Sequence, residues 1–196
     1  MNRTKVDELL CEALETERGG ARIYETALSC AQNADLREEW EKNLGESRRH
    51  QEILVEICTD FGLNPERETS GRKIVRSHAE TLIKAMQEAL SSGRREQAEI
   101  VAAEAVATAE LKDHMNWELI GEVAKKMEGS DATLLKKAYD EVEDQEDRHF
   151  YHARGWAREL WAVALDIPAV IPPPEKTMNV KSGMGAAAAQ TPRKLM

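Results

Sequence analysis

Several long stretches of this chain repeat apolar residues in alternating steps of three and four, and glutamates and histidines interrupt the repeat. That spacing is typical of one face of an α-helix. The interrupting residues are Glu17, Glu46, His50, Glu110, His114, Glu146 and His149. Burying ionisable groups on an apolar face costs free energy unless an opposite charge neutralises them. A fold for this chain must therefore bury several helical faces and also neutralise the charge on them.

The repeat predicts four long helices and one shorter helix. The long helices are expected at about residues 5–31, 35–61, 94–127 and 131–166, and the shorter one at about 72–90. Asp35 with Glu38 predicts a capping box at the start of the second helix. Short connectors favour antiparallel neighbours. The predicted fold class is all-α, with an antiparallel four-helix bundle over residues 1–167 and one short extra helix between helices two and three.

Residues 168–196 differ in composition from the rest of the chain. They contain a run of prolines, then Lys181-Ser182-Gly183, and then four consecutive alanines. Such low complexity predicts a disordered tail. This tail is expected to be either an inert extension or a peptide that docks on another protein.

Charge and cysteine content exclude several classes of partner. The net charge of the 196-residue chain is −9, which argues against binding to nucleic acid or to an anionic membrane surface. No secretory segment and no apolar run of about 18 residues is found. Cys11, Cys30 and Cys58 form no C-x-x-C pair, and free cysteines are typical of a reducing compartment. We therefore expect a cytoplasmic protein without a membrane span.

Two pairs among the interrupting residues have the spacing of metal ligands. Glu146-x-x-His149 presents a carboxylate and an imidazole on one side of a helix, one turn apart, and Glu46-x-x-x-His50 is one residue wider. Oxygen-rich ligation with one histidine per metal suits iron or manganese better than zinc or copper(I). The sequence therefore predicts a site for two divalent cations inside the helices.

Glu17 and Glu110 stand alone on the other two long helices and would supply bridging carboxylates. Each is followed seven residues later by an aromatic residue on the same face, Tyr24 and Trp117. With Glu46 and Glu146, they make four carboxylates, which match the charge of two divalent cations if the imidazoles are neutral. This weak repeat indicates two similar helical hairpins.

Some assignments stay open. Glu46 lies beside its apolar stripe, whose centre is Ser47, and Glu143 is a competing carboxylate on the fourth helix. His114 is an added ligand, a partner of a ligand or a core histidine, of which the first two are favoured, and His152 is expected at the surface. Taken singly, each such residue is more often an ordinary solvated side chain. The coincidence on four helices is what favours a metal site.

The segments at 35–40, 46–50 and 61–65 resemble the second helix of the small stress-induced bacterial ferritin-like family, which also has a Glu four residues before a His. That family belongs to the ferritin-like superfamily, with the rubrerythrins and bacterioferritins. The extra helix and Glu110 after Ala102-Ala103 are similar too, and the resemblance covers about residues 5–165. The chain departs from the family pattern at Ala107, at His114 and at the Glu-x-x-His of the fourth helix.

The resemblance implies a ferritin-like bundle that holds two irons, with manganese as the alternative, and oxidises Fe(II) with oxygen or peroxide. Ferroxidase- or peroxidase-type chemistry in iron handling or oxidative-stress defence is the expectation. One iron would be bound mainly by Glu17, Glu46 and His50, and the other by Glu110, Glu146 and His149. The alternative is a bundle with a degenerate site that serves as an interaction or oligomerisation module. We expect a homo-oligomer in either case.

Overall fold

A computed structural model describes residues 1–191, and these residues form helices and no strand. The helices are α1 (Arg3–Cys30), α2 (Ala34–Asp60), α3 (Ser70–Ser91), α4 (Arg95–Lys126), α5 (Ser130–Ala164), α6 (Pro174–Thr177) and α7 (Gly183–Ala189). The all-helical prediction is confirmed. The ends of α1 to α5 lie within two residues of the expected positions. No helix in the described part of the chain is both long enough and apolar enough to cross a membrane.

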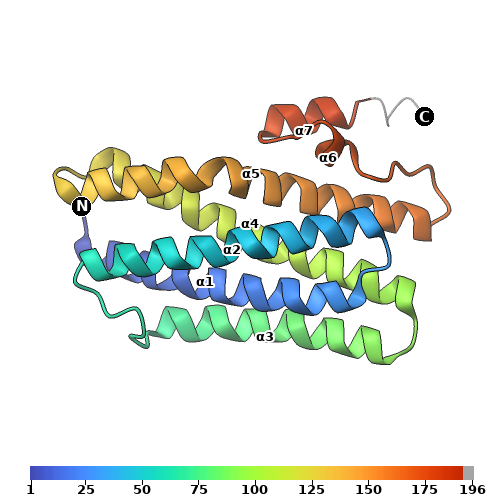
Figure 1. Cartoon of the computed structure of the whole chain (residues 1–196), viewed down its shortest axis with the longest axis horizontal. Coiled ribbons are helices and arrows are strands. Elements are labelled where there is room, and N and C mark those ends of the chain that lie inside the picture. The colour runs from blue at the N-terminus through green and yellow to red at the C-terminus, as the bar shows by residue number, and fades with distance from the viewer. Residues whose placement is uncertain (192–196) are drawn as a thin grey trace.

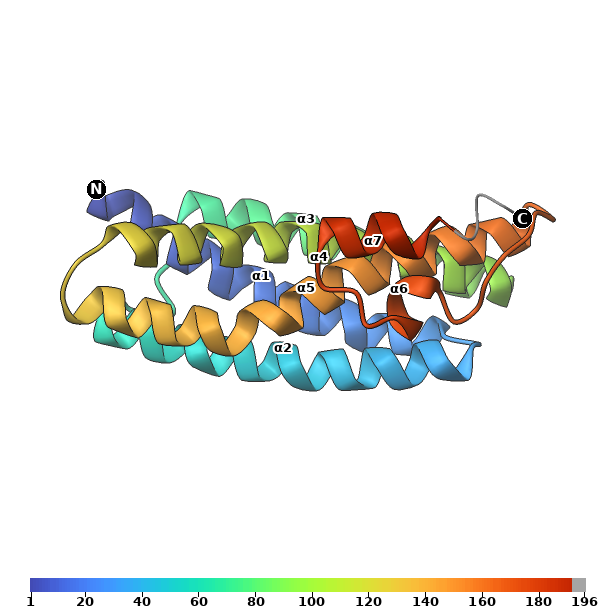
Figure 2. The ribbon, with the colours of Figure 1, turned by 90° about the horizontal axis from the view of Figure 1, so that it is seen from above.

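The five long helices lie side by side along one axis (Figures 1 and 2). Helix α1 packs against α2, α3 and α4, while α5 packs against α4 and α2. Figure 1 shows α3 carrying the chain back along the length of the molecule, so that α4 starts at the same end as α2. The helix pairs α1–α2 and α4–α5 are therefore two antiparallel hairpins, and α3 packs on α1 and α4 from outside.

Side-chain caps begin three of these helices. Asn2, Asn33 and Thr69 accept hydrogen bonds from backbone N–H groups three residues later. These bonds satisfy donors that have no partner inside the helix. The cap of α2 is Asn33, so the capping box predicted from Asp35 is wrong: Asp35 lies inside the first turn.

Two apolar clusters fill the two ends of the helical assembly. One contains Trp40, Met86 and Trp156, and the other contains Leu10, Trp117 and Leu135 among its buried members. On each of α1, α2, α4 and α5 the two clusters are separated by about two to three turns of helix. Buried Glu17, His50, Glu110, Glu146 and His149 lie in that gap, so a polar layer divides the core.

Close helix contact accounts for one of the two adjacent glycines in α1. A Cβ atom at Gly19 would lie 2.8 Å from the Cβ of Ala79 in α3. At Gly20 the nearest atom would be an oxygen of Asp113, at 4.0 Å. The first glycine thus lets α3 approach α1, and the second leaves room beside the polar layer.

The segment after α5 differs from the expected disordered tail. Residues 168–191 have a defined path that includes α6 and α7, and α6 packs on α5. Glu175 pairs with Arg158 at 2.7 Å, and Val180, Ala186 and Ala189 form a small buried cluster beside Tyr151. Low complexity concealed these contacts because a few residues carry them. The part of the tail prediction on residues 192–196 lies outside the described residues.

Candidate metal centre

The polar layer contains two groups of ligand-type side chains. Glu17, His50 and Glu146 form one group, and Glu110, Glu146 and His149 form the other. Within each group, one potential ligand atom of every residue lies within 4.8 Å of the others. All five residues are at most 3% exposed. Four helices therefore converge on one buried cluster.

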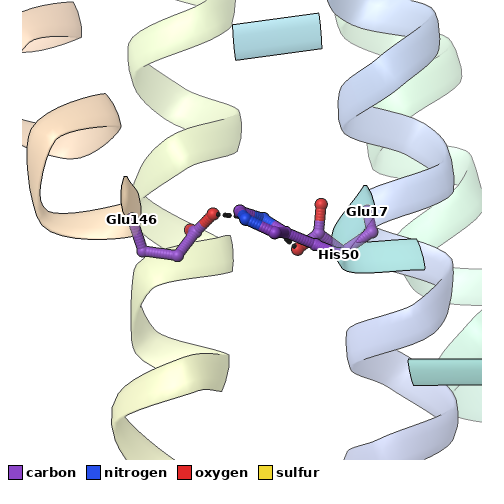
Figure 3. A group of neighbouring side chains, drawn as sticks. All are labelled: Glu17, His50 and Glu146. Atoms are coloured by element: carbon purple, nitrogen blue, oxygen red, sulfur yellow. Dashed lines mark ion pairs between the residues drawn. The ribbon is translucent and has the colours of Figure 1, made fainter. Parts of the chain in front are cut away.

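Glu146 is the member that both groups share. Its Oε1 atom lies 3.0 Å from Nδ1 of His50 and 3.6 Å from Nδ1 of His149. Figure 3 shows Glu146 reaching from its helix toward His50, with Glu17 on the other side of the imidazole. Oε1 of Glu17 is 3.1 Å from the same Nδ1 atom. The carboxylate of Glu146 thus lies between the two imidazoles.

Both imidazoles turn Nδ1 inward and Nε2 toward an oxygen acceptor. Nε2 of His50 is 3.1 Å from Oε1 of Gln145, and Nε2 of His149 is 2.8 Å from Oε2 of Glu46. Because each of these partners accepts a hydrogen bond, Nε2 carries a proton in both rings. The neutral tautomer then leaves a lone pair on Nδ1, which is the form that ligates a metal.

Many buried polar atoms of the cluster have no hydrogen-bond partner. The atoms without a hydrogen bond are Oε2 of Glu17, Nδ1 of His50, Oε2 of Glu110, both carboxylate oxygens of Glu146, and Nδ1 of His149. Among them, Nδ1 of His50 and Oε1 of Glu146 contact each other only as an ion pair, at 3.0 Å. Buried polar atoms are nearly always satisfied in native proteins, and each exception needs an explanation. Here the exceptions gather in one place and face one another.

Burial and the close approach of several charges shift the pKa values of the clustered carboxyl groups. Burial raises the pKa of Glu17, and burial together with the charge of Glu146 raises the pKa of Glu110 to about 7 despite the nearby His149. Burial acts in the same direction on Glu146, but its two imidazole neighbours outweigh that effect and lower its pKa. Glu146 is therefore the carboxylate that stays ionised between the rings.

The imidazoles respond in the opposite sense. Burial alone would lower the pKa of His50, yet the adjacent Glu17 and Glu146 raise it well above its ordinary value. Against the same effect of burial, the hydrogen bond that His149 donates to Glu46 and the charge of Glu110 raise the pKa of His149. Without metal, protons on the histidines partly balance the carboxylates.

Asp113 is a buried carboxylate beside the cluster that the sequence analysis did not select. It lies one turn after Glu110 on α4, and its Oδ1 atom has no hydrogen-bond partner. Burial, with the negative charges of Glu17, Glu146 and Glu110, raises its pKa well above the ordinary value. Its spacing from Glu110 was a usable signal, but α4 is rich in alanine on several faces, so the buried face was not evident.

The two aromatic residues of the sequence repeat contact the cluster crosswise. Nε1 of Trp117, on α4, donates a hydrogen bond to Glu17 on α1 at 2.9 Å. The Tyr24 hydroxyl, on α1, hydrogen-bonds Glu110 on α4 and accepts a bond from Asn43 at 3.1 Å. Each hairpin therefore holds the carboxylate of the other.

Two of the predicted ligands take other places. Glu46 joins neither group, because its carboxylate contacts the outer nitrogen of His149 and also Arg148. His114 points away from the cluster: its Nε2 pairs with Asp147 at 2.8 Å, and its ring stacks on Phe150. The helical period alone could not separate these neighbouring directions.

The structure also settles two side assignments. Glu143, the competing carboxylate on α5, is exposed and accepts a hydrogen bond from Tyr139. His152, expected at the surface, is buried, and its Nδ1 atom lies 2.6 Å from Glu39. The prediction for His152 is wrong because the side chain faces α2 across the helix contact.

The donor set fits two divalent cations. Glu17, Glu110 and Glu146 supply three carboxylates, Asp113 lies beside them as a fourth acidic group, and the two histidines can be neutral ligands. Carboxylate and imidazole donors without thiolate suit iron or manganese. The unpartnered inward atoms are those that such cations would satisfy.

No protein-family model matches the sequence, and neither a curated protein nor a solved structure matches it.

Proposed function

We propose that this chain is a ferritin-like four-helix bundle with an added helix, and that it is a non-haem di-iron protein that oxidises Fe(II) with oxygen or peroxide. Manganese is the alternative metal. The observation that carries the proposal is the pair of buried three-residue groups that share Glu146 and leave their inward atoms unpartnered. The resemblance of the second helix to the small stress-induced ferritin-like family supports the same class.

The distances favour a division of ligands that differs from the one expected from sequence. Glu17 and His50 would hold one metal, while Glu110 and His149 would hold the other. Glu146 would bridge the two. Glu46 would orient His149 and increase its basicity instead of ligating, as carboxylates commonly do for metal-bound histidines.

When bound, two irons would supply the electrons that reduce the oxidant. The residues of the chain fix the ligand geometry and exclude water, because all five ligands are buried. Asp113 lies beside the cluster with an unpartnered Oδ1 atom, and burial with the neighbouring carboxylates raises its pKa, which favours its protonated form. Tyr24 and Trp117 restrain the two terminal carboxylates by hydrogen bonds.

Elemental analysis of protein produced in iron-supplemented medium tests the proposal. We expect about two irons per chain in the parent protein and a clear loss in Glu110→Ala. The loaded protein should consume oxygen or peroxide when Fe(II) is added. Absence of iron and manganese from both proteins, with equal thermal stability, would favour the interaction-module alternative.

The expected homo-oligomer stays a prediction. Leu111, Met115 and Leu119 lie four residues apart on α4 and are nearly half exposed, which supports the expectation. Sedimentation analysis of the parent protein and of Leu119→Glu tests it. A monomeric parent protein would contradict it.

A further inference from the structure

A cavity of about 340 Å³ lies between α1, α3 and α4, outside the metal cluster. Its walls include Gly19 and Gly20 of α1, Ala79 and Leu82 of α3, and Ala109 of α4. None of the five cluster residues lines it. The volume is within the range of small-molecule sites, roughly 300–1,000 Å³.

Small side chains create the space, and local hydrogen bonds make its walls apolar. Gly19 and Gly20 of α1 line the cavity with backbone atoms, and Ala79 and Ala109 line it with single methyl groups. Thr81 and Thr108 donate their hydroxyl groups to backbone carbonyls of their own helices, each at 2.8 Å. Their methyl groups therefore remain for the lining, and few polar atoms are available to a ligand along the walls.

The charge of the lining is positive, although the whole chain carries −9. Among the described residues that line the cavity there is no Asp or Glu, and Lys112 is the cationic group. Nζ of Lys112 hydrogen-bonds Asn116 and lies 3.9 Å from Oε2 of Glu12, with the side chain 40% exposed. An ammonium has three donors, so Lys112 can still bind an anionic group.

We propose that this cavity binds a small monocarboxylic acid with an unbranched apolar chain. The chain lies against the glycine and alanine walls, and the carboxylate pairs with Lys112. Apolar walls with one well-placed charge are the usual design of such sites. None of the five cluster residues lines the cavity, so binding of the ligand does not require metal.

Isothermal titration calorimetry with octanoate tests the proposal on the full chain as purified. We expect saturable binding of one octanoate per chain. Lys112→Met should weaken octanoate binding about tenfold or more, because a hydrogen bond to a charged group is lost. The same substitution should change the affinity for 1-octanol by less than about twofold, since the alcohol has the chain without the charge.

A second variant fills the cavity. Ala109→Phe should abolish binding of both compounds, while Lys125→Met on the same helix and Ala164→Phe on α5 are matched surface controls that should bind normally. If Ala109→Phe does not fold, Ala109→Leu takes its place. Absence of octanoate binding to the folded parent protein, or equal weakening of acid and alcohol in Lys112→Met, would overturn the proposal. Iron content has no bearing on either result.

Discussion

The two hairpins contribute to the buried cluster with the same spacing but with different chemistry. Ser47 stands three residues before His50 in the first hairpin, where Glu146 stands three residues before His149 in the second. Gly20 likewise follows Glu17 by three residues, as Asp113 follows Glu110. The second hairpin therefore supplies three of the four inward carboxylates. A repeated helical scaffold can therefore carry an unequal charge distribution.

The supporting residues follow the same rule. Glu46 lies four residues before His50, and Gln145 lies four residues before His149, yet each contacts the histidine of the other hairpin. One acceptor is charged and the other is neutral. Charge-assisted hydrogen bonds are roughly twice as strong as neutral ones. The histidines at the two proposed metal positions should therefore differ in basicity.

Removing the carboxylate that both groups share should have the largest effect on metal binding. Glu146→Gln takes charge from both groups, so we expect iron to fall from about two per chain to near zero in elemental analysis. Glu143→Gln is the matched control, because Glu143 is exposed three residues earlier on the same helix. Full iron content in Glu146→Gln, or equal loss in the control, would show that Glu146 is not the bridge.

The pH dependence of metal-free stability should separate Glu110 from Glu146. The folded pKa of Glu110 is about 7, above its ordinary value of 4.5, so the folded state holds a proton that the unfolded state has lost. The free energy of unfolding should therefore fall as pH rises from about 4.5 to 7, by on the order of 3 kcal/mol from this residue. The raised pKa values of His50 and His149 act in the same direction, because their stabilisation is lost as they deprotonate.

Glu110→Gln should flatten that decline in urea unfolding of chelator-treated protein. On the acid side the sign reverses: the pKa of Glu46 is lowered to about 2 by His149 against the effect of burial, so its contribution is lost as pH falls from 4.5. Stability that rises between pH 5 and 8 without metal would contradict the assignment. Added metal should remove the decline, since it binds the deprotonated ligands.

Substitution of the supporting acceptors should have a smaller effect. Glu46→Leu should lower the affinity for the metal beside His149 by roughly 10–100-fold. Gln145→Leu should lower the affinity for the metal beside His50 by a smaller factor. Titration with Mn(II), which avoids oxidation, measures both. Lys42→Met controls for the surface ion pair that Glu46 also makes. Equal losses in the two variants would mean that the charge of Glu46 has no influence.

The crossed aromatic donors should give the smallest change. Tyr24→Phe removes a hydrogen bond to Glu110, so the pKa of Glu110 should rise further. The pH-dependent fall in the free energy of unfolding should then occur at higher pH, and that free energy should change by about 1 kcal/mol. Trp117→Phe is the counterpart on Glu17. Tyr139→Phe, at a half-buried tyrosine that donates a hydrogen bond to Glu143 and not to the cluster, should leave the transition in place.

Sequence periodicity was sufficient for the helices and for five residues of the cluster. Leu10, Leu14 and Glu17 lie on the same face of α1, so any rotation of the helix that buries the two leucines also buries Glu17. The same holds for Glu146 and His149 beside Val142 on α5. Regular spacing therefore located residues that point along the centre of a buried face.

Residues near the edge of a buried face could not be assigned in this way. Helix α4 contacts α1, α3 and α5 and is rich in alanine, so its sequence fits several rotations. Because of that ambiguity, the sequence pattern predicted that His114 faces the cluster, whereas its neighbour Asp113 does. The role of Glu46 depends on the distance between α2 and α5, and the contacts of residues 168–191 depend on the surface of α5. The spacing of residues along a single helix predicts neither the role of Glu46 nor these contacts.

The crossed supports make the centre a property of two hairpins together. If the chain were cut between α2 and α3, the first piece would keep Glu17 and His50 but lose the donor and the acceptor that orient them. Two identical subunits that complete each other across a twofold axis would obey the same geometry, but their centre would dissociate on dilution. Joining the halves in one polypeptide makes the integrity of the centre independent of protein concentration.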